Sequence, residues 1–348
     1  NFEYMLPIPS WQDLTEFGGK ARPWPHAFAA ALSVGLPMVA AILTGRIALG
    51  GLAALGALVI LHLPASPGPM PLYRLLGCAG ALTISLALGQ LSTAWPSASL
   101  PLFGGLIAAI VAATRLSNLP PPGHTLFVLA AGSGAAAGFH PEGLLDLVLV
   151  PPASAAMAIG IGWAAHRLSF EGSSHAAPAP LMASVPGTPA REVLIEALVF
   201  GVFAMLALAI ALGIGLERPY WVPVSCVSVM RGVTLQAVWT RSLQRIAGTL
   251  LGVVCTLLLL AVHPGPWVAV TILVLLVLGI YRTLGQNYAV TVLLATPALI
   301  VITELASINQ VPDLDLLITR MVDIALGSSI GLAGGTILKT MGRAQTRR

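Results

Sequence analysis

Long apolar runs alternate with short polar breaks along almost the whole chain. Because a bilayer core is about 30 Å thick, about 20 apolar helical residues cross it, and shorter spans are tolerated where neighbouring helices cover them. This pattern predicts an all-α polytopic membrane protein with about twelve transmembrane helices. They are expected at 27–44, 47–63, 75–94, 100–114, 124–139, 144–166, 193–216, 219–230, 246–262, 267–281, 288–302 and 316–338.

The composition agrees with a chain that faces lipid. Of 348 residues, 57% are hydrophobic and 9% are charged, whereas about a quarter of the residues in an average soluble domain are charged. The net charge of +4 is small, so no nucleic-acid partner is expected. The cysteines and histidines have no metal-ligand spacing, and no nucleotide-binding P-loop occurs. No metal, cofactor or catalytic residue is therefore predicted.

The basic residues fall on one side of the predicted spans. With the N-terminus in the cytoplasm, fourteen of the 17 Lys and Arg residues lie on the cytoplasmic side, and the exceptions are Arg46, Arg218 and Arg320. This distribution follows the positive-inside rule. It predicts a multi-pass protein of the bacterial inner (plasma) membrane with both termini in the cytoplasm.

The two halves of the chain repeat the same hydropathy pattern. A shift of 171 residues places Arg74-Leu-Leu-Gly77 on Arg245-Ile-Ala-Gly248 and Gly160 on Gly331. Because six spans per half is an even number, both halves insert the same way. Two parallel six-helix repeats, related by a pseudo-two-fold axis along the membrane normal, are therefore expected, with a transport pathway between them.

The predicted spans and repeats divide the chain into five parts. The first 25 residues do not resemble a signal peptide. We expect a cytoplasmic or interfacial segment at 1–25, the first repeat at 26–168, a Pro/Ser/Ala-rich linker at 169–190, the second repeat at 191–340 and a basic cytoplasmic tail at 341–348.

The eighth span, Tyr220 to Met230, is about half the usual length and contains Pro223. A Pro-rich segment, 62–71, follows the corresponding span of the first half. Short spans interrupted by proline in matching places of two repeats indicate a substrate site, because free backbone groups persist at membrane depth only inside protein or beside water. A kinked packing helix is the alternative.

Arginines near this span indicate an anionic substrate. Arg241 and Arg245 lie before the ninth span, and Arg74 is the counterpart of Arg245 in the first half. A guanidinium binds a carboxylate bidentately and stays charged, although cytoplasmic arginines also simply orient helices. Gly77 and Gly248, three residues after the matched arginines, are expected to let their helices pack closely against a neighbour.

Four further side chains are candidates on the outer side. Tyr220 and Trp221 are placed to stack on an aromatic ring, or they belong to an interfacial aromatic belt. Arg320 and Asp323 share one helix face. Asp323 is the candidate for proton coupling because ionisable groups within the membrane are usually functional, and a structural Arg–Asp pair is the alternative.

Two stretches resemble the fusaric acid resistance family of the aromatic acid exporter superfamily. In the first, Arg218-Pro-Tyr-Trp leads to Arg241-Ser-Leu-Gln-Arg-Ile-Ala-Gly-Thr-Leu-Leu-Gly252, which is similar to the family's Arg-x-x-Gly-Thr-x-x-x-Gly helix. In the second, Arg320-Met-Val-Asp-Ile-Ala-Leu-Gly327 is similar to its last span. The resemblance implies a proton-driven exporter of aromatic or other organic carboxylic acids. It also implies kinship with the plant aluminium-activated malate channels, in which two six-span subunits surround an anion pore.

An efflux transporter of organic anions is the leading hypothesis, and the bilayer and a small organic anion are its expected partners. An anion channel that uses the same arginines is its first rival. A membrane-embedded enzyme is less favoured, because the polar groups are dispersed along the chain. A scaffold subunit that works only with a separate adaptor is a further alternative. The larger family members carry a sizeable cytosolic domain after a six-span block, and this sequence departs from that pattern. Recruitment of a periplasmic adaptor is left as an open alternative.

Overall fold

The structure is a computed structural model. It describes residues 9–19, 21–64, 66–68, 70–120, 122–170, 189–231, 234–262, 265–304 and 314–346. Within these residues the chain is helical and contains no strand, so the expected all-α class is confirmed.

The described residues of the first half form seven α-helices and three short 3-10 helices. They are α1 (Trp11–Thr15), α2 (Trp24–Leu43), α3 (Ile47–Ala57), the 3-10 helix η1 (Leu58–His62), α4 (Leu72–Ser92), η2 (Pro96–Ala98), α5 (Ser99–Leu116), α6 (Thr125–Ala137), η3 (Pro141–Gly143) and α7 (Leu144–Phe170).

The second half contains only α-helices among its described residues. They are α8 (Ala190–Gly213), α9 (Trp221–Met230), α10 (Leu235–Ala261), α11 (Pro266–Thr283), α12 (Tyr288–Glu304) and α13 (Leu314–Thr346).

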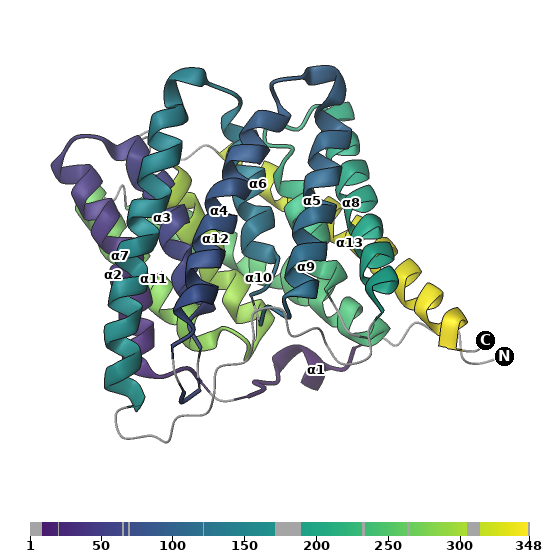
Figure 1. The fold of residues 1–348 in the computed structure, drawn as a ribbon, viewed down its shortest axis with the longest axis horizontal. Helices are drawn as coiled ribbons and strands as arrows, with labels where there is room; N and C mark the ends of the chain where they lie inside the picture. Colours follow the sequence, from purple (N-terminus) through teal and green to yellow (C-terminus); the bar gives the residue numbers. More distant parts are fainter. Residues whose placement is uncertain are drawn as a thin grey trace.

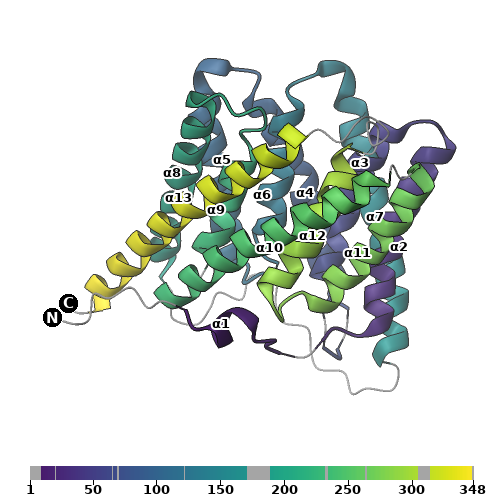
Figure 2. The same ribbon diagram turned by 180° about the vertical axis from the view of Figure 1, so that it is seen from behind.

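Eight described helical segments are long and apolar enough to cross a membrane. They comprise α2, α4, η2 with α5, η3 with α7, α8, α10, α11 and α13, and four shorter apolar helices, α3 with η1, α6, α9 and α12, lie among them. Helices α4, α5, α7 and α8 stand roughly upright in these views, α10 and α13 run obliquely, and α1 lies across one end of the molecule (Figures 1 and 2). The chain is therefore a multi-pass membrane protein.

The first helix of each half ends with the same hydrogen bonds. After α2, Gly45 has a φ of +68° and the Arg46 N–H donates to Ala41 O at 2.9 Å. After α8, Gly215 has a φ of +73° and the Leu216 N–H donates to Ala211 O at 3.0 Å. This is the Schellman termination, in which a left-handed glycine lets the chain satisfy the last carbonyls of a helix.

Contacts between helices follow a matching scheme in the two halves. In the first half α2, α3 and α7 pack against one another and α4 packs on α6, whereas in the second half α8, α9 and α13 do so and α10 packs on α12. Across the seam between the halves, α5 packs on α8 and α11 packs on α2, while α6 meets α9 and α12 meets α3. Each seam contact thus has a counterpart with the halves exchanged.

Glycines allow the closest of these contacts. A Cβ atom on Gly89 of α4 would overlap the Ala131 carbonyl oxygen of α6, and one on Gly134 of α6 would overlap the Leu86 carbonyl oxygen. Membrane helices associate through such small-residue faces because lipid offers them no hydrophobic driving force. The contact of α4 with α6 therefore depends on the absence of two side chains.

Two local expectations are wrong. Pro223 does not interrupt its helix, because α9 begins at Trp221 and the first helical turn accommodates proline. Gly77 makes no close contact, since a Cβ there would meet nothing within 4 Å. Gly160 and Gly331, which the 171-residue shift aligns, have different surroundings: a Cβ would meet nothing within 4 Å at Gly160 but would overlap the Cys226 carbonyl oxygen of α9 at Gly331.

Other boundaries differ slightly from expectation. Helix α10 begins at Leu235, before the expected start of the span at 246, so Arg241 and Arg245 lie on the helix itself. Helix α7 continues through Ser169 and Phe170. The remainder of the expected linker, 171–188, lies outside the described residues.

We predict that Gly89→Ala destabilises the protein by about 1–3 kcal/mol, because an added methyl group overpacks the contact between α4 and α6. The measurement is the thermal midpoint of the detergent-solubilised protein. Gly77→Ala is the matched control on the same helix, with open space around the new methyl group. An equal midpoint for the two variants would show that the glycine contact contributes nothing.

Candidate functional site

A cavity of about 700 Å³ opens between the halves at the end of the molecule where α1 lies. We call it the basic cavity because Arg231, Arg241 and Arg245 line it. Its walls come from α2, η1 and α6 of the first half and from α9, α10, α11 and α12 of the second half. The seam between the halves therefore holds a concave space with polar and apolar walls.

Tyr288 organises the two arginines of α10. Arg245 donates from Nη1 to the Tyr288 hydroxyl at 2.7 Å and from Nη2 to Ser225 Oγ at 3.0 Å. The Arg241 guanidinium carbon lies 4.2 Å from the centroid of the Tyr288 ring, within the range of a cation–π contact. One aromatic side chain of α12 thus fixes two cations of α10.

The arginines also satisfy backbone groups. Arg241 Nε donates to the Ser228 carbonyl at 3.4 Å, and Ser228 belongs to the last turn of α9, whose carbonyls lack partners within the helix. Arg231 donates to the Pro122 carbonyl and, at 3.2 Å, to Thr125 Oγ1. A cation at the C-terminus of a helix also complements its dipole, so these arginines stabilise the short helix.

No carboxylate neutralises the three arginines within the described part of the chain. The ion pairs found there join Arg115 to Glu196 and His140 to Glu142. Arg245 Nε is buried and has no hydrogen-bond partner. Because a guanidinium stays charged, the three arginines leave the basic cavity with positive charge that no ion pair among the described residues offsets.

Helix α1 and the residues after it line the mouth of the basic cavity through Asp13, Glu16 and Gly18. Gln244 donates to the Leu14 carbonyl at 3.1 Å and Asn287 donates to the Glu16 carbonyl at 3.1 Å. Hydrogen bonds from Ser10 lower the pKa of Asp13, which keeps it ionised. The segment is held at this mouth by α10 and by the residue before α12.

The remaining walls of the basic cavity are largely apolar. They include Val34, Leu61, Leu126, Val277 and Ile280, together with several further residues of α12. A cavity that combines a few placed charges with apolar walls is typical of a site for a small amphipathic ligand.

A second cavity, of about 770 Å³, lies toward the opposite end, and we call it the opposite cavity. It is lined by ends of α3, α4, α6 and α7 and by the segment before α9. Its charged or titratable lining residues are His140, Asp146, Glu217 and Arg218. Both linings contain two carboxylates, but the basic cavity has three arginines whereas the opposite cavity has one.

Trp221 connects the opposite cavity with α13. It lines both cavities, and the Arg320 guanidinium carbon lies 3.5 Å from the centroid of its ring. Asp323, one turn further along α13, is fully buried, and neither of its carboxylate oxygens accepts a hydrogen bond. Burial of a carboxylate without hydrogen bonds is costly when it is ionised.

The structure brings together some of the predicted site residues. Arg241, Arg245 and Trp221 line the basic cavity, while Tyr220 lines the opposite cavity and packs edge-on against Phe103. Pro223 is buried in α9 and lines neither cavity, and Arg74 at the start of α4 also lies outside both linings.

Tyr288, Ser225 and Ser228 are contact residues that the sequence analysis did not single out as site residues. Tyr288 is 43 positions from Arg245 in the chain, so no local pattern reveals their contact. The sequence does contain a signal for the two serines, because they lie three positions apart in the short span and therefore share a helix face.

Comparison with known proteins yields two similarities. Residues 205–334 match the family described as "Fusaric acid resistance protein-like". The chain is 37% identical over 147 residues to "Uncharacterized membrane protein YvaC" of Bacillus subtilis (strain 168). The aligned region covers 42% of this chain and 23% of that protein. The chain thus spans less than a quarter of the length of this relative. No solved structure matches the chain.

The matched region begins within α8 and ends within α13, and it contains all three arginines of the basic cavity. The similarity to the family described as "Fusaric acid resistance protein-like" therefore lies within the second half of this multi-pass membrane protein.

Proposed function

We propose that the protein exports aromatic or other organic carboxylic acids across the membrane, by transport and not by catalysis. The observation that carries the proposal is the basic cavity, where three guanidiniums without a carboxylate partner among the described residues adjoin apolar walls. Guanidinium donors fit a carboxylate, and the apolar walls fit a ring or chain. The family similarity of the matched region also favours transport.

The proposal includes a pathway between two parallel six-helix repeats, with twelve spans in total. The matching contact scheme of the halves, including the exchanged contacts across the seam, supports it. Eight long spans and four shorter apolar helices supply the twelve. The short helices are buried among the long ones, where incomplete spans are tolerated.

We place the basic cavity on the cytoplasmic side. The far end of α13 and α1 lie at the same end of the molecule (Figures 1 and 2), as an even number of spans requires. Arg22 and Arg282 meet at this end, where Arg282 donates to the Arg22 carbonyl. Basic residues collect on the cytoplasmic side of membrane proteins, so an anion would be captured inside and released outside.

Proton coupling is proposed for Asp323. Its carboxylate is buried without a hydrogen bond, and the cations whose field reaches it are Arg320 and Arg218. A buried carboxyl group alternates between neutral and charged forms when its surroundings change. An anion channel that uses the same arginines would need no such group, so the pH response separates the two mechanisms.

Arg245→Ala should reduce benzoate flux in proteoliposomes by about tenfold or more, because a charge-assisted hydrogen bond contributes about 1.5–3 kcal/mol. Arg74→Ala is the comparison variant, since Arg74 lies outside both linings. Membrane expression of both variants is measured in parallel. Equal flux in the Arg245→Ala variant and the unmodified protein would refute a binding role for Arg245.

Asp323→Asn should flatten the pH dependence of benzoate flux, because the amide cannot release a proton. Asp146→Asn, in the lining of the opposite cavity, removes a carboxylate elsewhere and should leave the profile unchanged. Flux that follows voltage and ignores the pH gradient in the unmodified protein would instead identify a channel.

A further inference from the structure

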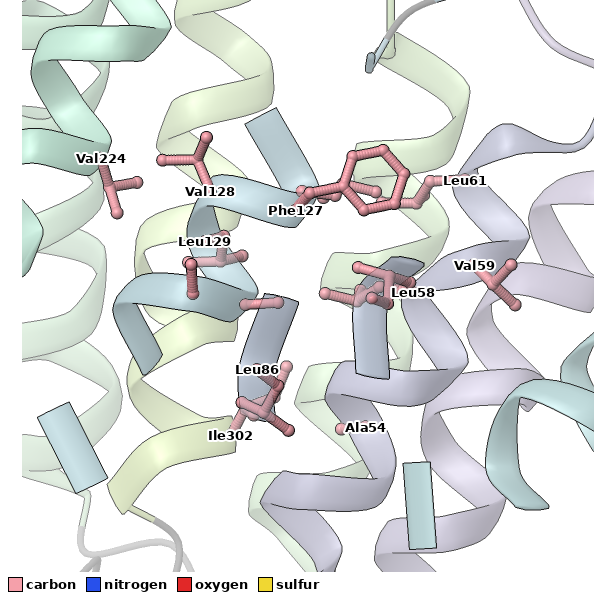
Figure 3. Packing of buried hydrophobic residues seen from close by; sticks show 14 of the residues in the cluster. Ala54, Leu58, Val59, Leu61, Leu86, Phe127, Val128, Leu129, Val224 and Ile302 are labelled. Atoms are coloured by element: carbon pink, nitrogen blue, oxygen red, sulfur yellow. The ribbon is translucent and has the colours of Figure 1, made fainter. Parts of the chain in front are cut away.

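The two cavities meet at one shared wall. Leu129 of α6, Trp221 and Val224 of α9 and Ile302 of α12 line both of them. The side chains of Leu129, Val224 and Ile302 come from three different helices (Figure 3). These three side chains and that of Trp221 therefore form the boundary between the two cavities.

The shared wall is tightly packed. Leu129 is 7% exposed, and Val224 and Ile302 are each 5% exposed. A Cβ atom on Gly132 of α6 would lie 3.0 Å from Val224 Cγ2, and one on Gly51 of α3 would lie 2.7 Å from the Ile302 carbonyl oxygen. Backbones of the two halves thus approach closely on either side of the wall, and little free space remains within it.

Polar groups lie on both sides of this wall but not in it. Ser228 and Thr291 line the basic cavity, while Gln90 and Ser133 line the opposite cavity. Three of the four shared residues have aliphatic side chains, and the fourth is the Trp221 indole. An apolar constriction between polar compartments loses its water and then blocks ions.

We propose that Leu129, Trp221, Val224 and Ile302 form an apolar gate that closes the pathway between the basic cavity and the opposite cavity. The inference rests on the proposed function for the existence of a pathway, and it adds where the pathway is closed and by which side chains. In the described structure the gate is shut, because its aliphatic members are almost fully buried.

Trp221 is the member of the gate with a charged neighbour. The Arg320 guanidinium stacks on its ring at 3.5 Å, a contact that strengthens when water is excluded. Since Arg320 lies one turn from the buried Asp323, a change of charge on α13 acts on the gate through this ring. Arg320 is thus a positioning residue for the gate.

The test measures access of a membrane-impermeant thiol reagent from each face in turn. Thr291→Cys places a thiol in the basic cavity, and Ser133→Cys places one in the opposite cavity. The exposed Cys255 is first replaced by Ser, and the other native cysteines, Cys78 and Cys226, are buried. In sealed vesicles of both orientations, each new thiol should react from one face only, and from opposite faces.

Opening the gate should abolish this sidedness. The double variant Val224→Ala/Ile302→Ala should raise labelling of the Thr291→Cys thiol from the opposite face by about tenfold or more, because water then enters the constriction. The matched control is Val227→Ala/Ile300→Ala. It removes the same groups from buried residues of the same two helices that line neither cavity.

Equal labelling in the two double variants would overturn the gate, as would labelling of the Thr291→Cys thiol from both faces before the gate is altered. Two single variants guard against misfolding of the double variants. Trp221→Ala should raise labelling, whereas Trp221→Phe keeps an aromatic ring for Arg320 and should not. Equal rates for these two would remove Trp221 from the gate. The assay needs no substrate, so a failure of carboxylate export appears only in the benzoate flux.

Discussion

Enclosure of the ten-residue helix α9 is the constraint on which the centre of the molecule depends. A helix of this length cannot cross a bilayer, and its free backbone groups would be costly in lipid. All residues from Val222 to Met230 are buried. Helices α6, α8, α10 and α13 contact it, and a Cβ at Gly327 or Gly331 of α13 would overlap its carbonyl oxygens. The short helix exists because longer helices with small residues surround it.

This enclosure explains why charge and cavity occur together. The last carbonyls of α9 need donors, and Arg241 supplies one while Tyr288 holds the guanidinium in place. The basic cavity lies beside the short helix, which contributes Trp221, Val224 and Ser228 to its lining. The same cations therefore stabilise the fold and prepare the proposed site.

The halves share a packing scheme but differ in chemistry. Helices α5 and α8 meet across the seam as α11 and α2 do, yet the arginines of the basic cavity all come from the second half. The first half contributes apolar wall residues such as Leu61 and Leu126, and Thr125, which accepts a hydrogen bond from Arg231. The carboxylates of Asp13 and Glu16 also come from the first half, so the two halves supply opposite charges to the same cavity.

The sequence by itself determined the helices and their apolar character, because bilayer thickness imposes a length that hydropathy records directly. It also singled out Arg241, Arg245 and Trp221 as candidates, through charge and the shortness of one span. Tertiary structure alone decided that Arg74 lies away from the cavities, that Tyr288 joins the two arginines of α10, and that Gly89, and not Gly77, forms the close contact of α4. These outcomes depend on how each helix is rotated about its axis in the packed protein and on contacts between residues far apart in the chain. The hydropathy pattern records neither of them.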